Sequence, residues 1–222
     1  MPTPAGSERP SRAPERLARR LRLIVVTDGS LAVPRTVTEV VAEAVDAGAP
    51  AVQLRNKGES ARELLDVGRA LRGITHAAGA LLFVNDRLDV ALALGADGVH
   101  LGPDDLPVRA IRDAAPKHFL IGRSADDPAV ARRAVRDGAD YIGCGTVFPT
   151  STKADAGQVI GPAGLARVVQ EVPVPVVGIG GIDEERSGAV AQTGAAGVAV
   201  IGALMASTDV AKTVRRLLAP WA

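Results

Sequence analysis

The chain has very little cysteine and few aromatic residues. One cysteine, Cys144, occurs in 222 residues, so a disulfide framework is excluded, and no Cys/His spacing matches a zinc site. A single cysteine is typical of proteins from a reducing compartment, and we expect a cytoplasmic location. Only five aromatic residues are present, which gives little support for base stacking, so we expect no nucleic-acid partner.

Long apolar runs are also missing. No run reaches the roughly 18 consecutive apolar residues of a membrane span, and the first twenty residues lack the apolar segment of a secretory signal. We therefore expect no membrane partner. The length suits one domain that buries most of its apolar surface without cross-links.

Charge is unevenly distributed along the chain. Residues 1–22 contain six arginines and two glutamates, a net charge of +4, whereas the whole chain carries +1. The Arg- and Pro-rich composition predicts a flexible, solvated extension over residues 1–20, with a basic nucleic-acid tail as the alternative. Residues 21–222 then form one folded domain.

Apolar runs alternate regularly with amphipathic stretches. The runs are rich in β-branched residues, as in strands covered on both faces, and they occupy 21–27, 51–55, 80–85, 96–101, 118–123, 140–146, 174–180 and 197–202. Helices are expected over 36–47, 60–78 and 127–137, each followed by glycine. Eight such units predict an α/β fold, a TIM (β/α)8 barrel. A doubly wound open sheet is the alternative, but no G-x-G-x-x-G follows the first run.

Two carboxylates each follow an apolar run. Asp86 and Asp105 would stand at the same end of a barrel, where catalytic groups of this fold gather. Hard oxygen ligands there suit Mg²⁺ carrying a diphosphate, which needs only one or two carboxylates. The alternatives are a turn or helix cap at Asn85-Asp86 and a cap at Asp104, which leaves Asp105 as the ligand by offset.

Basic and hydroxyl groups end other runs. Strand alternation sends Gln53 and Arg55 to one side, and Lys57 follows them. A buried arginine needs an anionic partner, either a ligand or a salt bridge to a neighbouring strand. Ser124 after the fifth run could donate to a leaving-group oxygen or cap the next helix.

The loop after the sixth run extends to Gly161, longer than usual for this fold. Thr150, Ser151 and Thr152 precede Lys153, and together these donors would form an anion cradle. Glycines 178, 180 and 181, with Gly202, let backbone N–H groups approach a phosphate, although glycine also permits tight turns.

These motifs resemble the thiamine phosphate synthase family. The matching segments are VQLRNKG (52–58), FVNDRLDVALALGADGVHLGPDDLP (83–107), IGRS (121–124), GTVFPTSTK (145–153), GIGGI (178–182) and GVAVIG (197–202). The resemblance covers nearly everything after Leu21. It implies a transferase of thiamine biosynthesis that joins hydroxymethylpyrimidine diphosphate to thiazole phosphate and releases thiamine monophosphate and pyrophosphate. A homo-oligomer is compatible with the sequence.

The resemblance also implies a role for each matching residue. The pyrimidine diphosphate site would comprise Gln53, Leu54, Arg55, Asn56, Lys57, Asn85, Ser124 and Lys153, with Arg55, Ser124 and Lys153 catalytic. Asp86 and Asp105 would hold one Mg²⁺. The thiazole phosphate site would comprise Thr150, Ser151, Thr152, Gly181, Ile201 and Gly202.

Two departures and two rival functions remain. The family commonly has serine where this chain has Gly202, which removes a hydroxyl but keeps an N–H, and often has proline at Thr146. A thiazole tautomerase of the same superfamily places a catalytic histidine two residues after the IGRS serine, where this chain has Asp126. A non-catalytic sensor of phosphate ligands is the other rival. We expect His100, inside the fourth run, to be a packed core residue.

Overall fold

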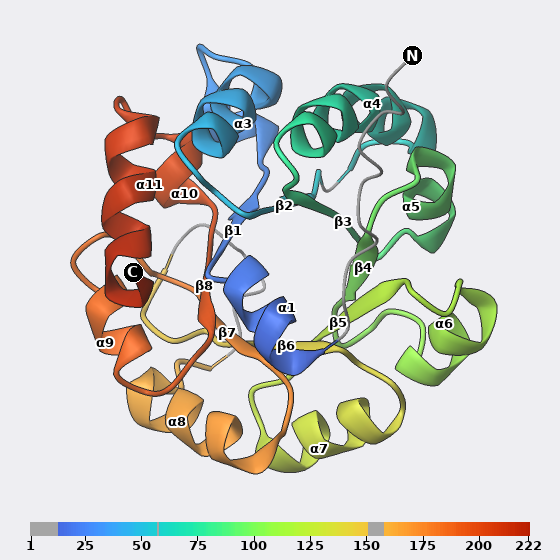
Figure 1. Cartoon of the computed structure of the whole chain (residues 1–222), viewed down its shortest axis with the longest axis vertical. Helices are drawn as coiled ribbons and strands as arrows, with labels where there is room; N and C mark the ends of the chain where they lie inside the picture. The colour runs from blue at the N-terminus through green and yellow to red at the C-terminus, as the bar shows by residue number, and fades with distance from the viewer. Residues whose placement is uncertain (1–12, 57, 151–157) are drawn as a thin grey trace, which may run out of the picture.

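Eight parallel strands close into one barrel. The computed structural model describes residues 13–56, 58–150 and 158–222 (Figure 1). The strands are β1 (Leu23–Val26), β2 (Ala51–Leu54), β3 (Leu81–Asn85), β4 (Gly98–Leu101), β5 (Leu120–Ser124), β6 (Tyr141–Cys144), β7 (Val176–Ile179) and β8 (Gly197–Val200). Each pairs with the next and β8 pairs with β1. The predicted TIM barrel is confirmed.

Helices form a ring outside the strands (Figure 1). They are α3 (Val37–Asp46), α4 (Ala61–Ala77), α5 (Leu88–Leu94), α6 (Val108–Ala114), α7 (Pro128–Arg136), α8 (Gly161–Glu171), α9 (Ser187–Ala191) and α11 (Val210–Leu218), with the shorter α2 (Gly29–Ala32), α10 (Gly202–Met205) and η1 (Ala219–Trp221). The three helices predicted explicitly, α3, α4 and α7, agree within one residue at each end. Within the described ranges, no helix is long and apolar enough to span a membrane.

Local signals explain where these helices begin. Thr36 and Ser60 form capping boxes with Glu39 and Glu63 at the starts of α3 and α4. Asp127 accepts hydrogen bonds from two backbone N–H groups of α7, which then begins at a proline. Side-chain caps and proline therefore set these boundaries.

A further helix precedes the barrel. Residues Pro14–Arg20 form α1, which lies across the amino end of the strands (Figure 1). Leu17 and Leu21, four residues apart, are fully buried, and Arg20 donates to the Gly79 carbonyl oxygen at 2.7 Å. The expected flexible extension therefore does not reach residue 20, because two buried leucines anchor this turn. Residues 1–12 lie outside the described part.

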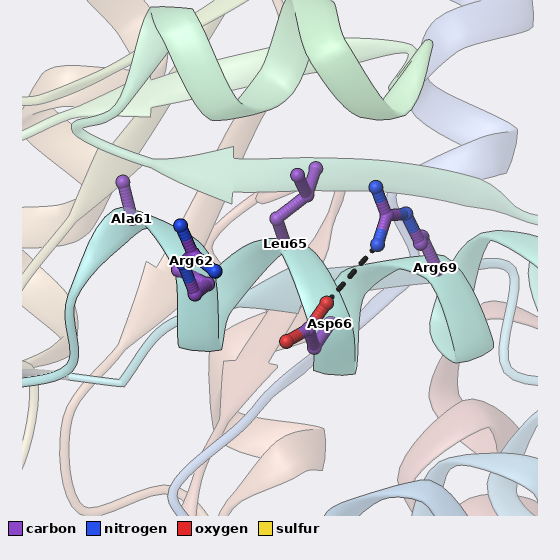
Figure 2. Close-up of a pocket in the computed structure, with 5 residues that line it drawn as sticks. All are labelled: Ala61, Arg62, Leu65, Asp66 and Arg69. Carbon is purple, nitrogen blue, oxygen red and sulfur yellow. Dashed lines mark hydrogen bonds and ion pairs between the residues drawn. The ribbon is translucent and has the colours of Figure 1, made fainter.

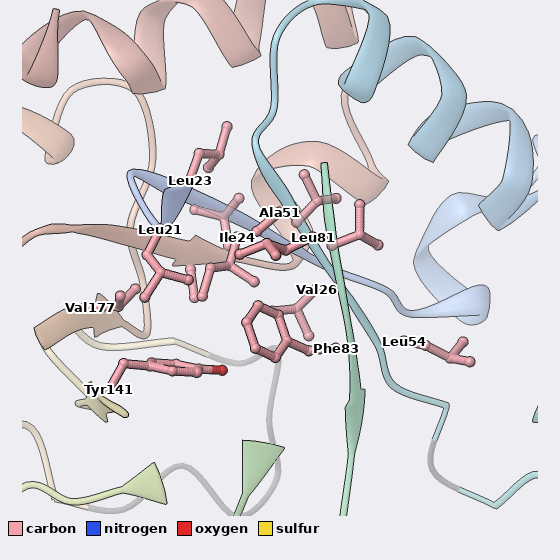
Figure 3. Close-up of a cluster of buried hydrophobic side chains, with 14 of the residues drawn as sticks. Leu21, Leu23, Ile24, Val26, Ala51, Leu54, Leu81, Phe83, Tyr141 and Val177 are labelled. Carbon is pink, nitrogen blue, oxygen red and sulfur yellow. The ribbon is translucent and has the colours of Figure 1, made fainter. Parts of the chain in front are cut away.

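Two large rings fill the barrel interior. Phe83 and Tyr141 point toward one another from β3 and β6, with ring centroids 5.3 Å apart (Figure 3). Glycine makes room for them, since a Cβ atom on Gly122 would lie 2.1 Å from the Tyr141 ring. The Tyr141 hydroxyl is consequently held inside the barrel.

Candidate active site

The carboxyl ends of the strands carry the predicted site residues. Strand register places Asn85 beside His100, Leu101 beside Arg123, and Ser124 beside Gly143. The described members of the predicted site lie in the last residues of strands or in the segments that follow them at this end, which we call the rim: Gln53, Leu54, Arg55, Asn56, Asn85, Asp86, Asp105, Ser124, Thr150, Gly181, Ile201 and Gly202. Four predicted members, Lys57, Ser151, Thr152 and Lys153, lie outside the described residues.

Arg55 is a buried cation, 8% exposed. Thr27 fixes its backbone, accepting from the Arg55 amide at 2.8 Å and donating to its carbonyl oxygen at 3.1 Å. In the part of the chain that the structure describes, neither a hydrogen bond nor an ion pair to the guanidinium is found, so the alternative of a salt bridge to a neighbouring strand has no support there. A buried guanidinium without a counter-charge is costly, and an anionic ligand would supply one.

The residues beside Arg55 differ in the groups that they can present to a ligand at the rim. Gln53 faces the barrel interior, where its side chain hydrogen-bonds with Tyr141. The Leu54 side chain is buried against Gly68 of α4, which leaves only its backbone for a ligand at the rim. Asn56 is held by the loop after β1, since its Oδ1 accepts from the Gly29 amide at 3.2 Å.

Asp86 adopts a left-handed backbone conformation with φ of 54°. Its amide donates to the His100 carbonyl oxygen at 2.8 Å, and its carboxylate accepts from the Asn85 side-chain amide at 2.9 Å. Residues other than glycine in this conformation concentrate at functional sites, although aspartate tolerates it better than most. Helix α5 has Arg87 as its N-cap, so Asp86 does not cap it. The other alternative, a turn, is found, because the Arg87 amide donates to the Asn85 carbonyl oxygen at 2.7 Å around Asp86.

The segment that follows β4 presents Asp105 rather than Asp104. Asp105 is half-buried and accepts from the Gly102 amide at 2.6 Å, whereas Asp104 is exposed. Helix α6 has Pro107 as its N-cap and no side-chain cap, so Asp104 does not cap it. Arg123 donates to the carbonyl oxygens of Gly102 and Pro103 and thereby pins this segment. Sequence reasoning gave Arg123 no role.

Ser124 lies within a side-chain network. Its Oγ is 3.0 Å from His100 Nε2, and His100 Nδ1 is 3.0 Å from the Tyr141 hydroxyl. Asp127, not Ser124, caps α7, so the capping alternative is not found. His100 is half-buried and joined to the rim, which differs from the packed core residue expected for it. The sequence did not predict this role of His100, because its contact with Ser124 depends on the register between β4 and β5.

The loops after β6 and β7 are joined at their roots. The amides of Val147 and Phe148 donate to the carbonyl oxygens of Ile179 and Gly180 at 2.9 and 3.0 Å. Gly181 has φ of 63°, and a Cβ atom there would lie 2.5 Å from the Pro149 carbonyl oxygen, so only glycine fits. The segment leading to Thr150 therefore runs against the backbone at Gly181.

Arg186 adds a positive charge beside this junction. It donates to the Gly181 carbonyl oxygen at 2.7 Å, and its guanidinium lies 5.3 Å from the centre of the Phe148 ring. Nearby, buried Ile201 precedes α10, which begins at Gly202 and directs backbone N–H groups to the rim. Sequence reasoning missed Arg186, since it lies four residues beyond the GIGGI motif.

The donor set suits a hard cation better than a soft one. No cluster of three or more His, Cys, Asp or Glu residues that could hold a metal occurs among the described residues. The rim offers two carboxylates, Asp86 and Asp105, whose oxygens are hard ligands with about four acceptor positions in each group. This matches Mg²⁺, which takes one or two carboxylates and completes its shell with substrate oxygens and water.

Covalent catalysis by the single cysteine does not fit the site. Cys144 is fully buried in β6, and burial raises the pKa of its thiol to about 12. A thiol with that pKa stays protonated at neutral pH and is a poor nucleophile. Cys144 is therefore unsuited to be the nucleophile of a reaction at the rim.

A shallow hollow lies elsewhere, along the outer face of α4 (Figure 2). It is lined by Ala61, Arg62, Leu65, Asp66 and Arg69, all from one helix, and Arg69 pairs with Asp66 at 3.0 Å. None of its residues belongs to the predicted site. The hollow is ordinary helix surface.

Comparison with known proteins gives a consistent result. Residues 23–204 match the family model described as thiamine monophosphate synthase. A thiamine-phosphate synthase from Pyrococcus furiosus is 45% identical over 201 residues, covering 90% of this chain and 95% of the relative. One from Moorella thermoacetica is 46% identical, covering 88% and 93%. The solved thiamine phosphate pyrophosphorylase from Pyrococcus furiosus superposes with a TM-score of 0.83 at 44% identity, covering 90% and 95%.

Proposed function

Because this chain belongs to the thiamine monophosphate synthase family, we propose that it is a thiamine-phosphate synthase. It transfers hydroxymethylpyrimidine from its diphosphate to thiazole phosphate and releases thiamine monophosphate and pyrophosphate. The observation that carries this proposal is Arg55, a buried cation at the rim to which no described residue supplies a counter-charge. A diphosphate would supply that charge.

The pyrimidine diphosphate binds on the β2 to β5 side of the rim. Arg55, Lys57 and Lys153 contact phosphate oxygens, because cations at fixed positions stabilise the charge that develops as pyrophosphate departs. Gln53, Leu54, Asn56, Asn85 and Ser124 complete this site. Asp86 and Asp105 would hold one Mg²⁺, which would supply further charge neutralisation to the leaving group.

Bond cleavage runs ahead of bond formation. The C–O bond to the diphosphate breaks while the Ser124 hydroxyl donates a hydrogen bond to the departing oxygen. The thiazole nitrogen then forms the new C–N bond with the pyrimidine methylene cation. The chain's contribution is to orient both partners and stabilise the leaving group.

Thiazole phosphate binds on the β6 to β8 side. Its phosphate contacts the hydroxyls of Thr150, Ser151 and Thr152 and the backbone N–H groups of Gly181, Ile201 and Gly202. Glycine at 202 removes the serine hydroxyl common in the family, so the backbone carries this contact.

We place the enzyme in the cytoplasm, because a chain with a single cysteine is typical of a reducing compartment.

An assay of the purified protein tests the proposal. The protein is incubated with both substrates and Mg²⁺, and thiamine monophosphate and pyrophosphate are measured; a parallel sample with a chelator should form neither. Equal amounts of the two products support a synthase. Isomerised thiazole alone would indicate the tautomerase, and tight binding of either phosphate without product would indicate a sensor.

A further inference from the structure

Four side chains form a hydrogen-bonded series across the barrel interior. Gln53 on β2 contacts the Tyr141 hydroxyl on β6, which is 3.0 Å from His100 Nδ1 on β4. His100 Nε2 is in turn 3.0 Å from Ser124 Oγ on β5. The series links the buried centre of the barrel to a hydroxyl at the rim, and it includes two residues that the chemistry above does not use.

The series has a direction. Burial raises the pKa of Tyr141 far above its usual range, so the phenol keeps its proton. The Gln53 contact favours the phenolate and opposes this rise, as expected when the amide N–H donates to the phenol oxygen. Tyr141 therefore has its own O–H to donate, and His100 Nδ1 lies within reach to accept it.

The direction of that bond determines the tautomer of His100. A neutral imidazole that accepts at Nδ1 carries its proton on Nε2. Nε2–H then donates to Ser124 Oγ, and the serine proton is directed away from His100. In the opposite tautomer Nδ1–H would compete with Gln53 for the phenol oxygen, and Nε2 would take up the serine proton.

We infer that His100 is a positioning residue, held as its Nε2–H tautomer by Tyr141, that turns the Ser124 hydroxyl into a donor toward the ligand. The identification of that ligand as the departing diphosphate rests on the proposed function. The tautomer itself does not.

Packing holds the two rings in place. A Cβ atom on Gly143 would lie 2.8 Å from His100 Cε1, and one on Gly122 would lie 2.1 Å from the Tyr141 ring. The centroids of the two rings are 5.5 Å apart, and Tyr141 also packs edge-on against Phe83 (Figure 3). Glycines on β5 and β6 thus clear the volume that the series occupies, and the rings cannot swing freely.

Two replacements of His100 distinguish the roles of its two ring nitrogens. In His100→Gln the amide nitrogen can occupy the position of Nε2 and donate to Ser124, whereas in His100→Asn the shorter amide reaches only the position of Nδ1. We expect His100→Asn to lower kcat by about 10- to 100-fold, the scale for losing a residue that orients a functional group. His100→Gln should recover most of that loss, while KM changes little in either variant.

Controls distinguish positioning from folding. His118→Gln, at an exposed position, should leave activity unchanged, and all variants should keep the melting temperature of the parent within a few degrees. In a Ser124→Ala background, His100→Asn should cause little further loss, because both changes remove one function. Equal losses in His100→Gln and His100→Asn, or additive losses with Ser124→Ala, would overturn the inference.

A spectroscopic measurement tests the tautomer without turnover. The chain has three histidines, so long-range ¹H–¹⁵N spectra of the untagged labelled protein can be assigned by comparison with His100→Gln. We expect His100 to show a protonated Nε2 and an unprotonated Nδ1, and a shift of this pattern in Tyr141→Phe. The reverse tautomer would refute the inference, whereas the expected tautomer in a protein that forms no thiamine monophosphate would refute only the proposed function.

Discussion

The two ends of the barrel treat buried charge differently. At the amino end Asp140 and Asp97 each have an arginine partner. Asp140, whose side chain is 4% exposed, pairs with Arg112 at 2.5 Å and accepts from the Ile121 amide at 2.8 Å. Asp97 pairs with Arg72 at 3.0 Å and accepts from the Leu82 amide at 2.8 Å. Both carboxylates are therefore paired within the protein, and the ion pairs join strands to helices.

At the rim one buried charge has no partner among the described residues. Arg55 is as buried as many core residues, yet no described residue pairs with its guanidinium. Asp86 sits in a backbone conformation that disfavours most residues. Both features have an energetic cost, which is the pattern expected where a ligand supplies the counter-charge of Arg55. Substitutions at the amino end should therefore cost stability, and substitutions at the rim should cost activity.

The largest effect is expected from Arg112→Ala. It leaves the Asp140 carboxylate buried without its cation, so the free energy of unfolding should fall by about 3–5 kcal/mol, as measured by urea denaturation. Turnover of the folded fraction should stay close to that of the parent. The double variant Arg112→Met/Asp140→Asn, which removes both charges, should recover most of the stability. A fall in turnover without loss of stability would contradict the comparison.

Arg55→Met should show the reverse behaviour. Methionine keeps much of the apolar stem but removes the charge, so turnover should fall by about 100- to 1,000-fold, or about 2.7–4 kcal/mol of transition-state stabilisation. The free energy of unfolding should not fall, since the substitution removes a buried cation to which no described residue supplies a counter-charge. Steady-state kinetics and urea denaturation on one preparation measure both. Unfolding as severe as in Arg112→Ala would make Arg55 a structural residue.

Periodicity carried enough information to predict the barrel. All eight strands lie within the predicted runs or one residue beyond them, because strands buried on both faces are continuously apolar. Helix α1 was missed since its surroundings are rich in arginine and proline, and composition outweighed the two leucines four residues apart. The apolar content of a single turn is too small a signal to overcome that bias.

The site was predictable only as far as each residue could be placed at a strand end. Asp86, Asp105 and Ser124 each follow an apolar run, which made them visible. Arg123 and His100 were assigned no site role, because what they do depends on which strand lies beside them, and single-sequence periodicity does not give register. The helix-cap alternatives, which the sequence left open, were excluded because the N-caps are Arg87, Pro107 and Asp127. The alternative of a turn at Asp86 was correct.

A smaller effect, on the Mg²⁺ dependence of activity, should distinguish Asp105 from Asp104. If Asp105 holds the cation, Asp105→Asn should raise the Mg²⁺ concentration needed for half-maximal activity by about 10- to 100-fold. Asp104→Asn removes the same charge one residue away, at an exposed position, and should change that concentration little. Mg²⁺ titrations of both variants give the comparison. Equal shifts would mean that the general negative charge of this segment matters, and that neither residue is a ligand.

The smallest effect concerns a carboxylate that lies beyond β7 yet is paired within the protein. Hydrogen bonds from Thr213 and Arg216 lower the pKa of Glu184 below its ordinary value of 4.5. A carboxyl group with a lowered pKa stabilises the fold at neutral pH, and this contribution is lost as pH falls below that ordinary value and through the pKa of the folded protein. Glu184→Gln should therefore reduce the free energy of unfolding at pH 7 by less than about 1 kcal/mol, without changing turnover.

Urea denaturation at a series of pH values measures this effect. The difference in stability between Glu184→Gln and the parent should disappear as pH falls below about 4.5. Glu185→Gln, at the exposed neighbouring position, serves as the matched control. A loss of turnover at constant stability would mean that Glu184 acts in the reaction although it is paired within the protein. That result would contradict the expectation that paired charges contribute to stability rather than to activity.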